Sequence, residues 1–205
     1  MPKVKVAVSG CLGKMGQEII NQILNNNKLI FVGGFEHKLH PMLNKKISDV
    51  TPIKSNLIIS DFSDDIIKKA DVLIDFTIPS ATLLNIKKAS ENKTAIVIGT
   101  TGFNTNQKNK IKNYSKKIPI LMSSNMSLGV NLLFKLVKQT ASTLKDIDND
   151  IEISETHHKH KIDAPSGTAL TLGEYAAAGR KTNLNKIKIM DRTKKNIKRK
   201  KGNIG

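Results

Sequence analysis

Apolar and polar positions alternate in short blocks along the first 127 residues. The apolar blocks, rich in Ile and Val, are typical of buried strands, and the segments between them carry apolar residues at helical spacing. The expected strands cover 3–8, 29–35, 71–76, 95–98 and 118–122, and the expected helices cover 14–25, 62–69, 80–92 and 105–116. Positions 37–56 have no clear period and predict a loop-rich segment. Because strands alternate with helices, the pattern predicts right-handed βαβ units and a parallel sheet, as in an α/β, Rossmann-like domain.

The pattern changes near residue 128. A long apolar face at helical spacing predicts a helix over 130–144, and a second helix is expected over 168–178. Alternation predicts strands at 150–155 and 186–190, and the polar stretch 157–167 predicts a loop. We therefore expect a domain over 1–127 and a second, α+β domain over 128–205.

Composition narrows the class of protein. The single cysteine, Cys11, excludes an internal disulfide and fits a reducing compartment. The N-terminus lacks a secretory pattern, and no apolar run approaches the roughly 20 residues that cross a bilayer. A cytoplasmic protein without a membrane partner is expected.

The formal net charge of +17 could indicate nucleic-acid binding. Most basic residues are lysines, however, spread along the chain among many Asn and Ile, which favours a compositional bias over a binding surface. The denser run at 194–201 is interpreted as a solvated loop. A polyanion patch is the alternative there, weakened by the absence of stacking aromatics.

A glycine-rich turn follows the first expected strand. Gly10, Gly13 and Gly16 have the spacing G-x-x-G-x-x-G and open the first expected helix. Small residues let a backbone approach a pyrophosphate, and a helix N-terminus favours an anion. Glu36 ends the second strand, where an acid meets the adenosine ribose in dinucleotide-binding folds. The turn and Glu36 together favour a dinucleotide site; an ordinary strand-to-helix turn is the alternative interpretation.

Two further polar loops follow expected strands. The segment 99–102, Gly-Thr-Thr-Gly, follows the fourth strand, and the segment 124–127, Ser-Asn-Met-Ser, follows the fifth. Ligands of open parallel sheets lie beyond the carboxyl ends of the strands, so both loops are candidates for the nicotinamide side of the cofactor. An ordinary turn is the alternative for each.

The densest polar cluster is the segment 155–169. His157, His158 and His160 could hold zinc, but other ligands are missing nearby, and a basic surface loop is a second alternative. A site for an anionic substrate is favoured. Imidazoles transfer protons near neutral pH, Lys161 can hold a carboxylate or donate a proton, and the segment 166–168 offers free backbone N–H groups at a helix start.

These residues resemble the signature of the 4-hydroxy-tetrahydrodipicolinate reductase family. The carriers of the resemblance are Glu155-Thr156-His157-His158-Lys159-His160-Lys161 and Asp163-Ala164-Pro165-Ser166-Gly167-Thr168-Ala169. Segments 8–16, 75–79, 99–103 and 125–131 match in order and spacing, so the resemblance covers essentially the whole chain. It implies NADH- or NADPH-dependent reduction of a cyclic dicarboxylate with loss of water, in lysine and diaminopimelate biosynthesis. It also implies that 1–127 binds the dinucleotide and that 128–205 carries the substrate and the catalytic groups.

The resemblance also implies residue roles. His157 would give or take a proton, Lys161 would be the second proton donor, and no metal is implied. The substrate carboxylates would be held by His158, Gly167 and Thr168. The cofactor would be held by Gly10, Cys11, Leu12, Gly13, Lys14 and Met15 at the pyrophosphate, Glu36 at the ribose, and Gly99, Thr100, Thr101, Ser123, Ser124, Asn125 and Met126 around the nicotinamide.

The chain departs from the family pattern in two places. Family members that use NADPH often have Arg directly after the ribose acid, where this chain has His37. The sequence therefore does not select one cofactor, and either NADH or NADPH is expected. Members also continue beyond the position of Gly205, so we expect the second domain of this chain to be incomplete. The resemblance further implies a homotetramer, the form that family members take. A truncated, inactive homologue that keeps only nucleotide binding is the alternative function.

Overall fold

A computed structural model of the protein describes residues 2–61, 63–144, 149–157, 159, 164–190 and 201–205. The chain divides into two compact units, Met1–Ser123 and Ser124–Gly205. Each unit has its own apolar core, and each is described by itself below.

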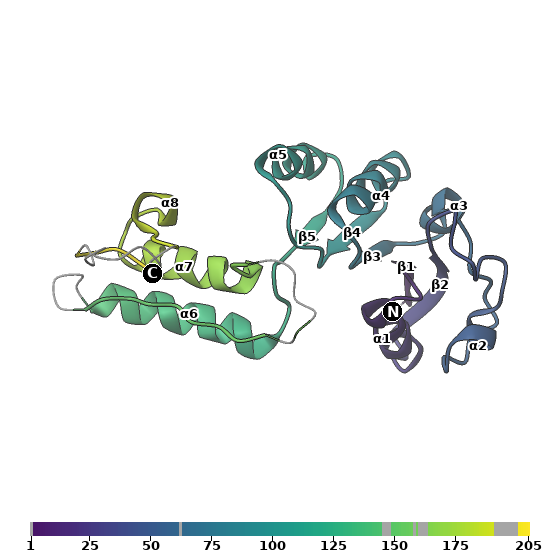
Figure 1. Ribbon diagram of the computed structural model, residues 1–205. Helices are drawn as coiled ribbons and strands as arrows, with labels where there is room; N and C mark the ends of the chain where they lie inside the picture. Colours follow the sequence, from purple (N-terminus) through teal and green to yellow (C-terminus); the bar gives the residue numbers. More distant parts are fainter. Residues whose placement is uncertain (1, 62, 145–148, 158, 160–163, 191–200) are drawn as a thin grey trace. The chain divides into compact units, whose positions relative to one another are not determined.

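The first unit is built on a parallel sheet. Its strands are β1 (Val4–Ser9), β2 (Leu29–Phe35), β3 (Val72–Asp75), β4 (Ala95–Ile98) and β5 (Ile120–Met122). They lie in the order β2-β1-β3-β4-β5, and every neighbouring pair is parallel (Figure 1). The α/β, Rossmann-like fold expected from the pattern is confirmed.

Helices cover both faces of this sheet. They are α1 (Lys14–Leu24), α2 (Ile47–Val50), α3 (Ser63–Lys68), α4 (Pro79–Glu91) and α5 (Thr105–Tyr114). Successive strand residues point to opposite faces, so Ala7 packs with α3, α4 and α5, whereas Val8 packs with α1. Figure 1 shows α1 on the opposite side of the sheet from α4 and α5. The segment 37–56, expected to be loop-rich, contains only the short α2.

One helix start differs from the expectation. The helix expected over 80–92 begins one residue earlier, because the N-cap of α4 is Ile78 and Pro79 takes the first helical position. Proline suits that position because its missing N–H would have no partner in the helix. Ser80 therefore lies inside the first turn.

The strands end level at one edge of the sheet. Ser9 pairs with Phe35 on one side and with Asp75 on the other, and Asp75 pairs with Ile98. The strand order changes direction at β1: β2 lies on one side of β1, and β3, β4 and β5 follow on the other side. Crevices at such a switch point are where open parallel sheets bind ligands.

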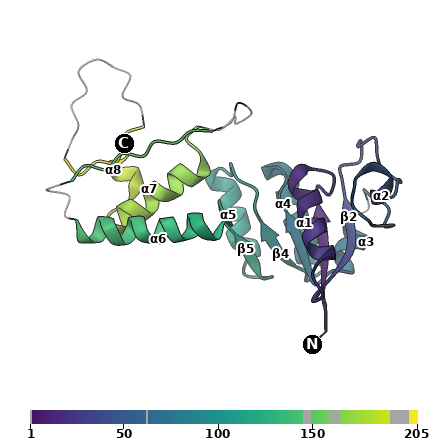
Figure 2. The ribbon, with the colours of Figure 1, turned by 90° about the horizontal axis from the view of Figure 1, so that it is seen from below.

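The second unit is mostly helical. α6 (Leu128–Thr143) packs along α7 (Gly167–Gly179), and the short α8 (Leu184–Ile187) follows (Figure 2). A Cβ at Gly179 would lie 2.4 Å from the carbonyl oxygen of Lys138, so the two long helices touch at backbone distance. The core of this unit joins Ala141, Ala176, Ala177, Leu184 and Ile204.

Two strand predictions in this unit are wrong. The segment 150–155 forms a single bridge, Ile151 with Ile204, and no strand. The segment 186–190 begins inside α8, after which Lys188 bridges the same Ile204. Asn183 caps α8, and Leu184 and Ile187, three positions apart, pack into one core, which favours a helical turn over the alternation that the sequence suggests.

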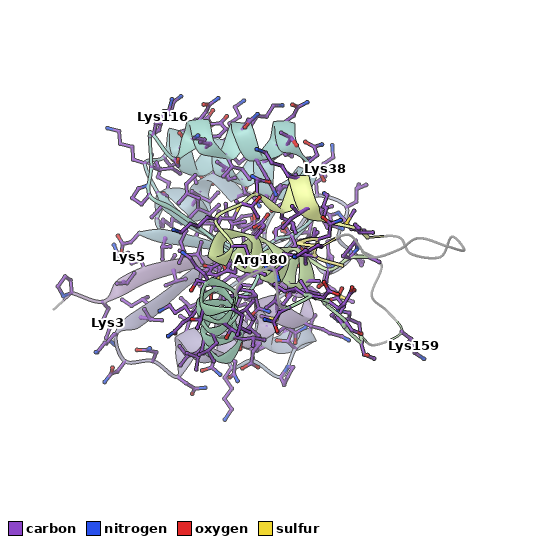
Figure 3. All side chains as sticks on the ribbon, turned by 90° about the vertical axis from the view of Figure 1, so that its left-hand side faces the viewer. Lys3, Lys5, Lys38, Lys116, Lys159 and Arg180 are labelled. Atoms are coloured by element: carbon purple, nitrogen blue, oxygen red, sulfur yellow. The ribbon has the colours of Figure 1, made fainter. Side chains whose placement is uncertain are left out.

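Basic side chains are spread over the described surface and are not concentrated on one helix or strand. Figure 3 shows the labelled Lys3, Lys5, Lys38 and Lys116 of the first unit projecting from different parts of its fold. Among the helices of the described residues, none is long and apolar enough to span a bilayer.

Candidate active site

The glycine turn after β1 is built by backbone conformation and close approach. Gly10 has φ +66°, a conformation that side chains disfavour, and its N–H donates to the carbonyl of Phe35 at 2.9 Å. The N–H of Gly13 donates back to the carbonyl of Gly10 at 3.0 Å. A Cβ at Gly16 would lie only 2.1 Å from that same carbonyl oxygen. The turn therefore wraps tightly over the start of α1.

The start of α1 is left open for an anion. Its N-cap is Gly13, and no side chain caps it. A helix N-terminus without a side-chain cap presents N–H groups and the positive end of the helix dipole. The Glu36 carboxylate, which follows β2, accepts from the N–H of Leu12 at 2.8 Å and so anchors the turn to the end of the second strand. These features fit a pyrophosphate at the turn and a ribose beside Glu36.

Cys11 lies underneath the turn. Its side chain is fully buried and packs against Gly34. Burial raises the pKa of the Cys11 thiol to about 12, and the Glu36 carboxylate adds to the effect. The thiol is therefore neutral and inert, and only the backbone of Cys11 can face a ligand. Lys14 and Met15, by contrast, are exposed on the first turn of α1.

A cavity of about 560 Å³ opens beside the turn within the first unit. This volume is typical of small-molecule sites. Its lining comes from the ends of β1 and β2, the segments that follow β2 and β3, the start of α3 and one side of α4: Ser9, Gly10, Phe35, Glu36, His37, Lys38, Asp61, Ser63, Thr77, Ile78, Ala81, Leu84, Asn85 and Lys88. A glycine turn, a ribose acid and an adjacent cavity meet the requirements of a dinucleotide, so the residues present fit a nicotinamide cofactor.

The loop after β4 is held in place by hydrogen bonds to Asp75. Gly99 donates its N–H to the backbone carbonyl of Asp75 at 2.9 Å. Thr100 is almost fully buried, and its hydroxyl donates to the Asp75 carboxylate at 3.2 Å. Thr101 is exposed. Of the two hydroxyls expected to face a nicotinamide, only that of Thr101 is therefore free of the buried network.

The loop after β5 crosses from the first unit to the second. Ser123 donates its N–H to the carbonyl of Ile98, at the end of β4. Ser124 shares a hydrogen bond with Thr171 of α7 at 2.8 Å, and the Asn125 amide donates to the hydroxyl of Thr168 at 3.3 Å. Within the second unit, the structure thus joins a residue expected at the cofactor, Asn125, to one expected at the substrate, Thr168. Met126, the last of this expected set, is 40% exposed.

His157 is held by a carboxylate that sequence reasoning gave no role. The imidazole Nε2 lies 2.8 Å from the Oε2 atom of Glu155. Glu155 also accepts hydrogen bonds from the N–H and the hydroxyl of Ser166. Residual burial acts to raise the pKa of Glu155, but the hydrogen bonds from Ser166 and His157 outweigh it and hold the pKa at about 2. An ionised Glu155 therefore orients His157.

Ser166 also defines the start of α7. It is the N-cap, and its hydroxyl accepts from the N–H of Ala169 at 3.0 Å. Gly167 and Thr168 occupy the first helical positions, whose N–H groups have no partner within the helix, whereas the Ser166 N–H, expected to be free, donates to Glu155 at 2.8 Å. Glu155 and Ser166 thus join the His157 segment to the helix start that is expected to hold the substrate.

Two predicted site residues, His158 and Lys161, lie outside the described residues. In the described ranges, no group of three or more His, Cys, Asp or Glu is arranged to hold a metal ion. Asp75 and Glu155 are polar groups to which the sequence pattern gave no role. The signals that could have found them are an acid at the end of an apolar strand, for Asp75, and the i, i+2 spacing of Glu155 and His157.

Comparison with known proteins assigns the family. The family model described as dihydrodipicolinate reductase, N-terminus, matches residues 4–126, and that described as dihydrodipicolinate reductase, C-terminus, matches residues 129–205. The chain belongs to the dihydrodipicolinate reductase family. The resemblance carried by the signature at 155–169 is thereby confirmed.

Individual relatives agree with this assignment. The 4-hydroxy-tetrahydrodipicolinate reductase of Sulfurovum sp. (strain NBC37-1) is 42% identical over 188 residues, which are 92% of this chain and 69% of the relative. The protein of the same name from Pelagibacter ubique (strain HTCC1062) is 44% identical over 184 residues, which are 90% of this chain and 67% of the relative. The family members that match are therefore longer than this chain.

A solved structure shares the fold. The dipicolinate-bound dihydrodipicolinate reductase from Paenisporosarcina sp. TG-14 superposes with a TM-score of 0.69 at 28% identity, covering 96% of this chain and 71% of that one. Membership of this family makes the chain an NAD(P)H-dependent oxidoreductase by descent.

Proposed function

We propose that this chain reduces 4-hydroxy-tetrahydrodipicolinate to tetrahydrodipicolinate with NADH or NADPH and releases water, in lysine and diaminopimelate biosynthesis. The observation that carries the proposal is the pairing of His157 with an ionised Glu155, which Ser166 ties to the start of α7. The match of both family models supports it. The dipicolinate bound to the related structure belongs to the same class of cyclic dicarboxylates.

The first unit supplies the cofactor site. The bound nicotinamide would supply a hydride. The glycine turn and the open N-terminus of α1 would receive the pyrophosphate, and Glu36 would accept hydrogen bonds from the ribose hydroxyls. The cavity beside the turn presents His37 and Lys38 next to Glu36, so the site offers an acid for a free ribose and, in Lys38, a cation for a 2′-phosphate. We therefore propose that both cofactors are accepted.

The second unit supplies the proton and the substrate contacts. His157 would exchange a proton with the substrate, held in orientation by Glu155, and Lys161 would donate the second proton. His158, Gly167 and Thr168 would bind the carboxylates, the last two at the N-terminus of α7, where helix N–H groups favour an anion. A positioned acid and neutralised carboxylates lower the barrier to reduction.

We also propose that copies of the chain associate. The support is an apolar face on α6, where Leu128 is 87% exposed, Leu132 is 56% exposed and Leu136 is 50% exposed. Faces of this kind mark contact surfaces in other proteins. Light scattering coupled to size exclusion tests this proposal, and a monomer at all concentrations would contradict it.

The function is tested by comparing three forms of the full chain with freshly generated substrate. The unaltered chain should oxidise NADH or NADPH only when the substrate is present. His157→Gln should slow turnover by about a hundredfold or more, the usual contribution of a positioned acid or base, while the Kd for NADH stays unchanged. Lys116→Gln, which changes an exposed side chain beyond the end of α5, should keep full activity. Equal loss of turnover and of NADH binding in His157→Gln would show that His157 is structural.

A further inference from the structure

A buried carboxylate lies at the centre of the ligand-binding edge of the sheet. Asp75 is the last residue of β3, the middle strand, and its exposed fraction is 0%. No ion pair to Asp75 occurs in the ranges that the structure describes, so its partners are neutral hydrogen-bond donors. Burying a carboxylate is costly, and an apolar residue usually serves a core at least as well. Its presence calls for a role beyond packing.

One carboxylate oxygen of Asp75 accepts hydrogen bonds from three threonines. The Oδ1 atom accepts from the N–H of Thr77 at 3.0 Å and from its hydroxyl at 2.7 Å. It also accepts from the hydroxyls of Thr82 at 3.1 Å and Thr100 at 3.2 Å. The threonines also lie close to one another, since the Thr82 and Thr100 hydroxyl oxygens are 2.8 Å apart and the N–H of Thr77 donates to the Thr100 hydroxyl at 3.0 Å. The loops after β3 and β4 are thereby locked together.

The other oxygen of Asp75 reaches the glycine turn. The Oδ2 atom accepts from the Asn85 amide of α4 at 2.7 Å, and the same amide donates to the Ser9 hydroxyl at 2.8 Å. Ser9 ends β1 and directly precedes Gly10, whose conformation starts the turn. Asn85 and Ser9 are almost fully buried and line the cavity beside the turn, so this link lies in the wall of that cavity.

The network joins three loops that are otherwise separate in sequence. Ser9 leads into the glycine turn, Thr77 lies in the loop after β3, and Thr100 lies in the loop after β4. The first of these loops is proposed to hold the pyrophosphate and the last to lie at the nicotinamide. Thr77 lines the cavity beside the turn, whereas Asp75 and Thr82 are fully buried beneath it.

We infer that Asp75 is a positioning residue for the nicotinamide cofactor: its two carboxylate oxygens fix the loops after β1, β3 and β4 in the arrangement that binds the dinucleotide. The inference rests on the proposed function, because it requires that this edge of the sheet binds NADH or NADPH. Asp75 touches no ligand in this role. It acts through Thr77, Thr100 and, by way of Asn85, Ser9.

The test is a fluorescence titration of NADH into the full chain, which gives the Kd and the number of sites. Asp75→Asn keeps the shape but sets an amide against the Asn85 amide, so one buried donor is left without an acceptor. We expect the Kd to rise about tenfold, the equivalent of one lost hydrogen bond to a charged group, with the number of sites unchanged. Asp71→Asn is the matched control, because Asp71 precedes the same strand at its opposite end and its side chain accepts from the Lys5 N–H there, at 2.7 Å.

A rescue separates positioning from simple stabilisation. In the double variant Asp75→Asn with Asn85→Asp, the carboxylate moves across the pair and accepts from both the new amide and the Ser9 hydroxyl. The Kd should return toward that of the unaltered chain. Should Asp75→Asn fail to fold, Thr82→Val takes its place, since the Thr82 hydroxyl is fully buried in the network and reaches no cofactor. It should raise the Kd for NADH several-fold.

Each other outcome overturns the inference. An unchanged Kd in Asp75→Asn, or in Thr82→Val where that variant replaces it, would show that the loops keep their positions without the network. Fewer binding sites with an unchanged Kd would show that Asp75 only stabilises the fold. Failure of the unaltered chain to bind NADH or NADPH would refute the proposed function itself, and this result is recognisable because it needs no variant.

Discussion

Replacing Gly16 by alanine tests how the glycine turn is built. The added Cβ would lie 2.1 Å from the carbonyl oxygen of Gly10, whereas ordinary contacts begin at 3.4 Å. The obstruction is backbone, which cannot rotate away, so the turn or α1 must retreat by about 1 Å. Overpacking of this kind costs about 1–3 kcal/mol, and the better helix propensity of alanine returns up to about 1 kcal/mol. We expect a net loss of about 1–2 kcal/mol.

The consequences appear in both stability and binding. A loss of about 1–2 kcal/mol lowers the midpoint of thermal unfolding by several degrees in a unit of this size. Because the displaced carbonyl belongs to the turn proposed to hold the pyrophosphate, the Kd for NADH should rise about tenfold or more. Circular dichroism during heating and NADH fluorescence measure the two effects on the same sample.

A matched alanine substitution gives the control. A Cβ at Gly129, in the first turn of α6, would meet only the Ser127 hydroxyl oxygen at 3.9 Å. Gly129→Ala should therefore keep or raise the unfolding midpoint and leave NADH binding unchanged. A Gly16→Ala chain with the midpoint and the Kd of the unaltered protein would refute the close approach on which this reasoning depends.

Three further predictions follow from the site. Because hydrogen bonds hold the pKa of Glu155 at about 2, its contribution to stability is full above its unfolded value near 4.5 and disappears as the pH falls toward 2. Glu155→Gln should therefore lower the free energy of unfolding by about 1 kcal/mol near neutral pH, a value that allows for solvent screening of this partly exposed side chain. Urea titrations should show that the difference between the two chains shrinks below pH 4. A difference that stays constant with pH would contradict the assignment. Cys11, with a thiol pKa of about 12, should not react with iodoacetamide in the native chain at neutral pH but should react after unfolding, and rapid native labelling seen by mass spectrometry would show that the turn opens. Lys161→Ala should raise the KM for the substrate or lower kcat while leaving the Kd for NADH unchanged, and steady-state kinetics identical to those of the unaltered chain would remove Lys161 from the mechanism.

The sequence predicts the first unit well because its signals are local. Ile- and Val-rich blocks of four to seven residues alternate with amphipathic segments, and the observed strands fall within or next to the expected ranges. The edge at which the polar loops meet was also predictable. Parallel strands bring their carboxyl ends to one side, so polar loops distant in sequence must converge there.

The failures concern features that depend on distant partners. Alternation at 150–155 and 186–190 indicates extended chain, but a strand needs a ladder, and in the described residues each segment forms one isolated bridge, with Ile204. The Asp75 network was beyond prediction for the same reason. Its link from Asn85 to Ser9 spans 76 positions, and no local pattern reports which buried hydroxyls will face one carboxylate.

The most direct test of the whole account is transfer of isotope from cofactor to product. NADH carrying deuterium at the transferred position is mixed with the full chain and freshly generated 4-hydroxy-tetrahydrodipicolinate, and the product is analysed by mass spectrometry. The account predicts tetrahydrodipicolinate that contains the deuterium, formed about a hundredfold or more faster by the unaltered chain than by His157→Gln. Oxidation of NADH without deuterium in this product, or saturable NADH binding with no product at all, would contradict it.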